Sequence, residues 1–235
     1  MKADILAQLQ ADRAAKRPVA RVTDLDSGAE SLVYLADTKE EISLPSGLIE
    51  AARRALEIDR SQPFETGGGR YFIHAHNPPL RLIIVGAVHI AQPLSRIAAL
   101  AGYAVTVVDP RRAFASGARF AGVAVSQDWP DEALTALAPD SRTAVVTLTH
   151  DPKLDNPALA VALRSPAFYV GSLGSKRTHA KRCEGLAEMG VDATAIARIH
   201  GPIGLSIGAA SPAEIAVSII AQITQVRRQG AQAAA

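Results

Sequence analysis

The 235-residue sequence has a single cysteine, 4% aromatic residues and almost no net charge. Cys183 alone cannot form an intrachain disulfide or a multi-cysteine zinc site. The formal charge of +2 gives no electrostatic reason to expect binding to nucleic acid or a membrane surface. No run approaches the roughly 20 apolar residues that span a bilayer, and the N-terminus lacks a secretion-signal core. We therefore expect a cytoplasmic protein without nucleic-acid partners or membrane insertion.

Hydrophobic residues make up 48% of the chain, which is enough for a buried core. The two prolines of Asn77-Pro78-Pro79 can join neither a helix interior nor a central strand, so they predict a rigid connector. We expect a small N-terminal α+β domain over residues 1–78 and a second domain over 79–235. The first is expected to contain helices over Lys2–Arg17 and Gly47–Asp59 and strands over Val19–Thr23, Ser31–Ala36 and Arg70–His74.

The second domain alternates short apolar runs with segments of helical spacing. This alternation predicts an α/β fold with a Rossmann-like, doubly wound parallel sheet. The expected strands are Leu80–Val85, Ala104–Val108, Gly122–Ser126, Thr143–Thr149, Ala167–Val170 and Arg198–Ile199. The expected helices include Leu94–Ala101, Asp131–Ala138, Ala158–Leu163 and Ser175–Met189, and a last helix with Ser211 as N-cap, Pro212 at its first position and Glu214 completing a capping box.

The first strand of this domain runs into a turn at Gly86, and Asp109 ends the next strand 23 positions later. This layout is typical of dinucleotide folds, in which such a carboxylate accepts a hydrogen bond from a ribose hydroxyl. However, Val88 occupies the position of the second fingerprint glycine, which normally lets the backbone approach a pyrophosphate. Two interpretations therefore stay open: an NAD(P) site with His89 or His150 as its acid–base residue, and a turn that has no nucleotide role.

Two further loops follow predicted strands. Thr149, His150 and Asp151, with Asp155 nearby, could bind a metal or move a proton, or the carboxylates could cap the next helix. In the next loop a phosphate cradle is predicted at a helix N-terminus, unless Ser175 only caps the helix and the cations face solvent. The residues of this second loop are Gly171, Ser172, Gly174, Ser175, Lys176 and Arg177.

A third loop runs from His200 to Gly208 and includes Gly204. Its glycines fit either the close approach of a ligand or tight packing over the sheet. Because parallel strands end at one edge, all these loops are expected to share a crevice at the switch point. With the usual strand order, Gly86 would lie opposite Thr149 and His150.

These blocks, in this order, resemble the XdhC/CoxI family of maturation factors for molybdenum hydroxylases such as xanthine dehydrogenase. The resemblance covers about Pro79 to Arg228. It rests on Gly86-Ala-Val-His89, Thr106-Val-Val-Asp109-Pro-Arg111, Thr149-His150-Asp151, Tyr169-Val-Gly-Ser-Leu-Gly-Ser-Lys176, Pro202-Ile-Gly-Leu-Ser-Ile-Gly208 and Ser211-Pro-Ala-Glu-Ile-Ala-Val-Ser-Ile219.

The resemblance implies a chaperone, not a turnover enzyme, that binds the molybdenum cofactor and delivers it to the apo-hydroxylase. It also implies a Rossmann-like C-terminal domain that holds molybdopterin or its dinucleotide form. A cysteine desulfurase is a further implied partner, and a homodimer an implied assembly. The implied contacts come from the matched strand-end residues, among them Gly86, His89, Asp109, Arg111, Thr149, His150, Asp151, Gly171, Ser172, Gly174, Ser175, Lys176 and Gly204.

Two features depart from the family pattern. Val88 stands where a glycine usually precedes the histidine, and the first domain lacks the family's Cys-Gly-Gly motif. Two alternatives therefore remain: an NAD(P)-dependent oxidoreductase, and an assembly factor of the same system that binds no ligand.

Overall fold

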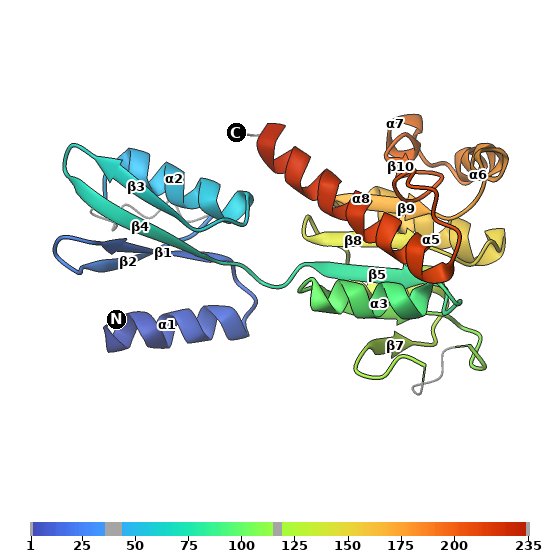
Figure 1. Cartoon of the computed structure of the whole chain (residues 1–235), viewed down its shortest axis with the longest axis horizontal. Coiled ribbons are helices and arrows are strands. Elements are labelled where there is room, and N and C mark those ends of the chain that lie inside the picture. Colours follow the sequence, from blue (N-terminus) through green and yellow to red (C-terminus); the bar gives the residue numbers. More distant parts are fainter. Residues whose placement is uncertain (1, 36–43, 115–118, 234–235) are drawn as a thin grey trace. The chain divides into compact units, whose positions relative to one another are not determined.

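The computed structural model describes residues 2–35, 44–114 and 119–233 (Figure 1). It contains two compact units, the first ending at Pro78 and the second comprising Pro79–Gly230. Each has its own sheet, one antiparallel and one parallel. The predicted fold class, a Rossmann-like α/β sheet with a small α+β domain, is therefore confirmed.

The first unit is a four-stranded antiparallel sheet in the order β2-β1-β4-β3. In its core, apolar side chains of one helix, α2, pack against the sheet. Leu48 and Leu56 come from the helix, and Val22 and Ile73 from the strands. A second helix, α1, is tied to the end of β2 by a 2.8 Å hydrogen bond from the Tyr34 hydroxyl to Asp12. The elements are α1 (Ala3–Ala14), β1 (Val19–Asp24), β2 (Glu30–Val33), α2 (Ser46–Glu57), β3 (Gln62–Thr66) and β4 (Gly69–His76).

One strand of this unit, β3, is not predicted by the sequence, because Pro63 and its polar neighbours give no strand signal. The strand lies at the sheet edge, where proline is tolerated because one side of the backbone needs no partner. Thr66 pairs with Gly69, so Gly67 and Gly68 between them form the turn of the β3–β4 hairpin. The strand expected over Ser31–Ala36 ends at Val33, and Ala36 lies outside the described residues.

The second unit contains a six-stranded parallel sheet in the order β10-β9-β8-β5-β6-β7. This is the doubly wound order, in which the chain starts at β5 in the middle and builds outward in both directions. The elements are β5 (Arg81–Val85), α3 (Ala91–Leu100), β6 (Ala104–Val108), β7 (Ala124–Ser126), α4 (Pro130–Leu137), β8 (Thr143–Thr147), α5 (Pro152–Arg164), β9 (Tyr169–Ser172), α6 (Lys176–Glu188), α7 (Ala193–Ile196), β10 (Ile199–His200) and α8 (Pro212–Ala233).

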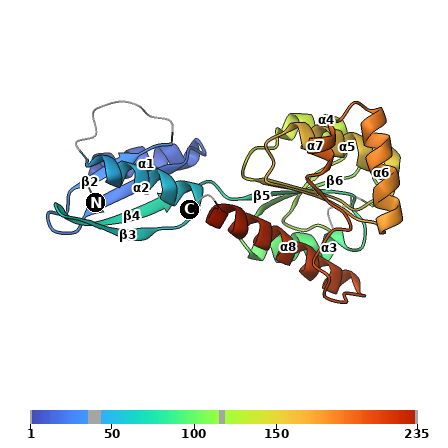
Figure 2. The same ribbon diagram turned by 90° about the horizontal axis from the view of Figure 1, so that it is seen from above.

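Helices cover both faces of the parallel sheet (Figure 2). On one face, α3 and α8 pack against residues such as Ile84, Val107 and Val146. On the other, α4, α5 and α6 pack against residues such as Ile83 and Val145. Because both faces are covered, β5 and β8 are apolar on both sides, which is why the sequence shows continuous hydrophobic runs there.

The start of α8 shows how local sequence fixes an element. The Glu214 carboxylate accepts a 2.8 Å bond from the Ser211 backbone N–H, and Ser211 Oγ accepts one of 3.3 Å from the Glu214 N–H. This is the capping box that the sequence predicts. Ile219 and Ile223 of the same helix are fully buried, so this face of the helix packs against the core.

Candidate ligand site at the carboxyl edge of the parallel sheet

The sheet reverses its strand order between β5 and β8, so the predicted crevice position coincides with the end of these two strands. Val85 and Thr147 pair directly, and Gly86 and Leu148 follow them. Gly86 has a φ of +108°, and a Cβ there would lie 2.6 Å from Thr149 Cγ2. Glycine is therefore required at this position by the approach of the β8–α5 loop.

Asp109, at the end of β6, is the predicted ribose acceptor, but its side chain is fully buried. The carboxylate accepts hydrogen bonds from the Ala87 backbone N–H at 2.7 Å and from Arg111, through its backbone N–H and its guanidinium, at 2.8–3.0 Å. Burial alone would raise the Asp109 pKa, but these bonds outweigh it and lower the pKa. In this arrangement Asp109 holds the turn after β5 and leaves no exposed oxygen for a ribose hydroxyl.

Three neighbours of this turn differ in exposure. His89 is exposed, whereas Val88 is partly buried and packs against the core of the α3 face. Arg111, 36% exposed, lies over the Phe114 ring at 4.6 Å while it pairs with Asp109. The guanidinium is therefore already engaged on two sides.

The β8–α5 loop positions its polar groups with hydrogen bonds of its own. Asp151 caps α5 by accepting from the Lys153 backbone N–H at 2.9 Å, so the capping interpretation is correct for this residue. Thr149 Oγ1 donates to Asp155 at 2.7 Å and accepts from the Asp151 N–H at 3.0 Å. His150 lies between them with a φ of +63° and an exposed side chain. The loop therefore directs His150 outward from a fixed base.

Asp155 does not cap the helix but is buried on α5, opposite Arg182 of α6. Their side chains are 1% and 5% exposed, and Asp155 Oδ2 lies 3.8 Å from Arg182 Nη2. Burial raises the Asp155 pKa and lowers the Arg182 pKa, because each charge is removed from water. Arg182 Nη2 also donates to the Leu173 carbonyl at 2.8 Å. Asp155 Oδ2 and Arg182 Nη1 have no hydrogen-bond partner among the described residues.

The β9–α6 loop begins inside the sheet. Ser172 is buried and its hydroxyl lies 2.5 Å from that of Thr147, while a Cβ on Gly171 would overlap Ile203. Ser175 caps α6 by accepting from the Thr178 backbone N–H at 3.2 Å. Lys176 and Arg177 are exposed. Ser175 therefore caps α6, and a phosphate cradle at this helix start stays a prediction.

Two glycines of the third loop, Gly201 and Gly204, fit tight packing, whereas Gly208 has open space around it. A Cβ on Gly204 would overlap Ser218 of α8, and one on Gly201 would overlap the His179 ring of α6. The Gly204 backbone N–H donates to Gln222 at 2.8 Å, and the His200 ring stacks on Tyr169 at 4.6 Å. These contacts close the loop over the sheet edge.

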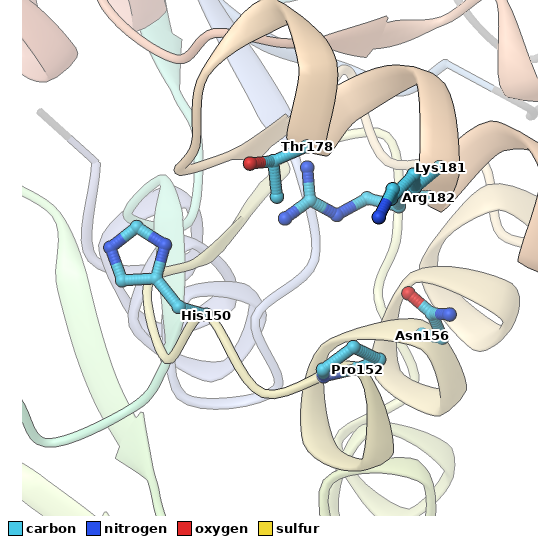
Figure 3. Close-up of a pocket in the computed structure, with 6 residues that line it drawn as sticks. All are labelled: His150, Pro152, Asn156, Thr178, Lys181 and Arg182. Carbon is cyan, nitrogen blue, oxygen red and sulfur yellow. The ribbon is translucent and has the colours of Figure 1, made fainter.

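A pocket of about 120 Å³ opens beside the β8–α5 loop (Figure 3). Figure 3 shows the guanidinium of Arg182 pointing from α6 toward His150, with the Thr178 side chain beside it. The volume accommodates a few water molecules or one phosphate-sized anion. Its lining residues come from α5, α6 and the loop before α5: His150, Pro152, Asn156, Thr178, Lys181 and Arg182.

Of these six residues, the sequence predicts only His150 as a site residue. Thr178 lies in the first turn of α6, and Lys181 and Arg182 lie in its second turn, beyond the helix start to which the sequence points. The available signal is a second basic pair, Lys181-Arg182, five positions after Lys176-Arg177. Among the described residues, no group of three or more His, Cys, Asp or Glu side chains is arranged to hold a metal ion.

Comparison with known proteins identifies the family. Residues 82–223, more than half of the chain, match the model of the XdhC Rossmann domain. The chain belongs to the XdhC family. The matched range contains all the strand-end loops described above, so the resemblance seen in the sequence is confirmed.

Three curated XdhC relatives match over about two thirds of this chain. The chain is 32% identical over 161 residues to the uncharacterized protein YqeB of Escherichia coli, covering 68% of this chain and 30% of YqeB. It is 31% identical over 150 residues to the molybdenum cofactor insertion chaperone PaoD of the same organism, covering 64% and 41%. It is 30% identical over 159 residues to a probable xanthine dehydrogenase component of Bacillus subtilis, covering 67% and 46%.

A solved structure extends the likeness to both units. The crystal structure of a xanthine dehydrogenase from Bacillus halodurans has a TM-score of 0.75 and 25% identity, and the match covers 99% of this chain and 69% of that one. The chain spans less than half the length of the curated relatives it matches. None of the described helices is both long and apolar enough to cross a bilayer.

Proposed function

We propose that this XdhC-family chain binds the molybdenum cofactor and delivers it to the apo-form of a xanthine dehydrogenase-type hydroxylase. The observation that carries the proposal is the 31% identity to a molybdenum cofactor insertion chaperone. The family match supports it, because residues 82–223 include every loop at the carboxyl edge of the sheet. In this proposal the cofactor is the cargo of the chain.

The donor set at this edge suits one part of that cargo. Arg182 is 6% exposed, and its Nη1 lacks a partner among the described residues at the pocket beside the crevice. A buried cationic donor without a partner favours an anionic acceptor. Molybdopterin carries a phosphate, and the neighbouring Thr178 and Lys181 add a hydroxyl and an ammonium group. This chain's own contribution would be to bind and orient that phosphate while the rest of the cargo stays accessible for transfer.

Two observations weigh against an NAD(P)-dependent oxidoreductase. Val88 packs on the core where a fingerprint glycine would admit a pyrophosphate. Asp109 is fully buried and engaged by Ala87 and Arg111, so it presents no oxygen to a ribose. The dinucleotide form of the cofactor, a cysteine desulfurase partner, a homodimer and a cytoplasmic location stay predictions from the sequence.

The test is to purify the chain from cells that make the cofactor and from cells that do not. After oxidative release, we expect pterin fluorescence only from the first preparation. Absence of pterin from both would contradict the proposal. Recovery of a hydroxylase polypeptide in a pull-down from the cofactor-deficient cells, without pterin in either preparation, would favour the assembly factor that binds no ligand.

A further inference from the structure

We propose that the pocket between α6 and the β8–α5 loop is a phosphate-monoester site in which Arg182 is the principal donor. The site differs from the predicted cradle at the first turn of α6. Its two cations, Lys181 and Arg182, lie in the second turn of the helix, and Arg182 is buried instead of exposed. The assignment rests on the proposed function, because it identifies the phosphate as that of the pterin cargo.

The position of Arg182 carries this assignment. Its side chain is 5% exposed, and Nη2 is fixed by the Leu173 carbonyl at 2.8 Å. This bond fixes the guanidinium plane of a side chain that lines the pocket, and the buried Nη1 of the same group has no hydrogen-bond partner among the described residues. A positioned, desolvated donor forms a stronger hydrogen bond to an anion than an exposed one does.

Two other polar side chains complete the donor set. Lys181 lines the pocket and is exposed, so its ammonium group is hydrated in the free protein and can approach an anion when one binds. The Thr178 hydroxyl lies 3.0 Å from Ser175 Oγ, and when Ser175 is the donor of that bond the Thr178 proton is free to be donated to an anion. His150 lines the pocket from the β8–α5 loop, across from Arg182 (Figure 3).

Asp155 is the group that opposes an anion here. Its Oδ2 lies 3.8 Å from Arg182 Nη2, too long for a hydrogen bond, and its Oδ1 is taken up by Thr149. The carboxylate therefore compensates the arginine charge only in part and does not occupy Nη1. An anion in the pocket would supply the missing acceptor for Nη1.

The experiment titrates inorganic phosphate into protein purified from cofactor-deficient cells, at constant ionic strength, and follows backbone amide shifts by NMR. We expect saturable shifts at His150–Asp151 and across Thr178–Arg182. Lys181→Ala should weaken phosphate binding about threefold, because the lysine is exposed. Arg96→Ala, which removes an exposed cation of α3 that does not line the pocket, should leave the affinity within about twofold.

Arg182 needs a paired variant, since its removal alone would leave Asp155 as a buried, unpaired charge. In Asp155→Asn/Arg182→Gln both charges are lost together, and thermal unfolding checks that the domain still folds. Phosphate binding should fall at least about tenfold, as expected for the loss of a charge-assisted hydrogen bond. Unchanged affinity in a folded double variant, or equal effects of Lys181→Ala and Arg96→Ala, would overturn the site.

The source of the phosphate is decided by pterin retention in cells that make the cofactor. Loss of both phosphate binding and pterin in the double variant supports the assignment to the cargo. Loss of phosphate binding with full pterin retention overturns that assignment and leaves a free-phosphate site. If the wild type retains no pterin but binds phosphate through Arg182, the proposed function fails and the anion site stands.

Discussion

Replacing Asp109 by alanine should destabilise the second unit even though the residue lies where a dinucleotide fold would place a ligand contact. The carboxylate is completely buried and joins the turn after β5 to the loop after β6. Its removal leaves the buried Ala87 N–H without an acceptor and releases Arg111 from its ion pair.

The magnitude follows from these two losses. An unsatisfied buried N–H costs about 1–3 kcal/mol. Breaking a buried ion pair from one side costs about 3–5 kcal/mol, but the Arg111 side chain is 36% exposed and recovers much of its hydration. We therefore expect Asp109→Ala to lower the free energy of unfolding by about 3 kcal/mol. Asp109→Asn, which keeps one acceptor oxygen, should cost less.

Urea unfolding followed by tryptophan fluorescence measures this effect, because the single tryptophan, Trp129, lies in the second unit. Arg112→Ala is the matched control: it removes an adjacent exposed arginine and should change stability by less than about 0.5 kcal/mol. If Asp109→Ala unfolds at the same urea concentration as the wild type, the carboxylate does not hold the turn. Asp109 would then be available to a ligand after all.

Three further predictions concern other parts of the chain. Gly86→Ala adds an overlap with Thr149 to the strain of a positive φ, whereas Gly102→Ala has the same strain but open space. In urea unfolding, Gly86→Ala should therefore lower the free energy of unfolding by about 1–3 kcal/mol more than Gly102→Ala does. Equal losses would contradict the close approach of the β8–α5 loop. Gln222→Ala removes the acceptor of both the Tyr169 hydroxyl and the Gly204 N–H. It should lower the free energy of unfolding, measured by thermal unfolding, by about 2 kcal/mol, which is more than Tyr169→Phe should. The reverse order would show that Gln222 does not anchor the loop. Burial, with the charges of His74, Arg21 and Arg13, lowers the pKa of His76 to about 4, below the usual 6.5, so the unfolded chain binds a proton at higher pH than the folded chain does. The first unit should therefore lose stability as the pH falls from about 6.5 toward 4. His76→Gln should flatten this pH dependence in circular-dichroism melts, and an unchanged slope would refute the prediction.

Local signals are sufficient to predict most of the second unit. The runs that form β5, β6 and β8 are apolar on both faces, and the capping box of α8 can be recognised from Ser211, Pro212 and Glu214 alone. Strand order then follows from the usual doubly wound topology, which places Gly86 against Thr149. In the first unit, β3 is missed, because an edge strand needs no hydrophobic alternation.

The site is harder to predict, because the sequence does not show which polar groups satisfy one another. Asp109 fits a ribose acceptor by position, but Ala87 and Arg111 already occupy its oxygens. Similarly, the Ser175 hydroxyl oxygen accepts the hydrogen bond that caps α6, from the Thr178 backbone N–H. Arg182 looks like one of several cations on a basic helix, and only the packing of α6 on α5 shows it to be buried opposite Asp155.

The most direct test of the proposed function is native mass spectrometry of the chain purified from cofactor-producing cells. We expect a bound species whose mass corresponds to a phosphate-bearing pterin, with or without a nucleotide. Binding should be lost on denaturation and absent from the Asp155→Asn/Arg182→Gln variant. A nicotinamide dinucleotide in its place would contradict the assignment of this chain as a molybdenum cofactor chaperone.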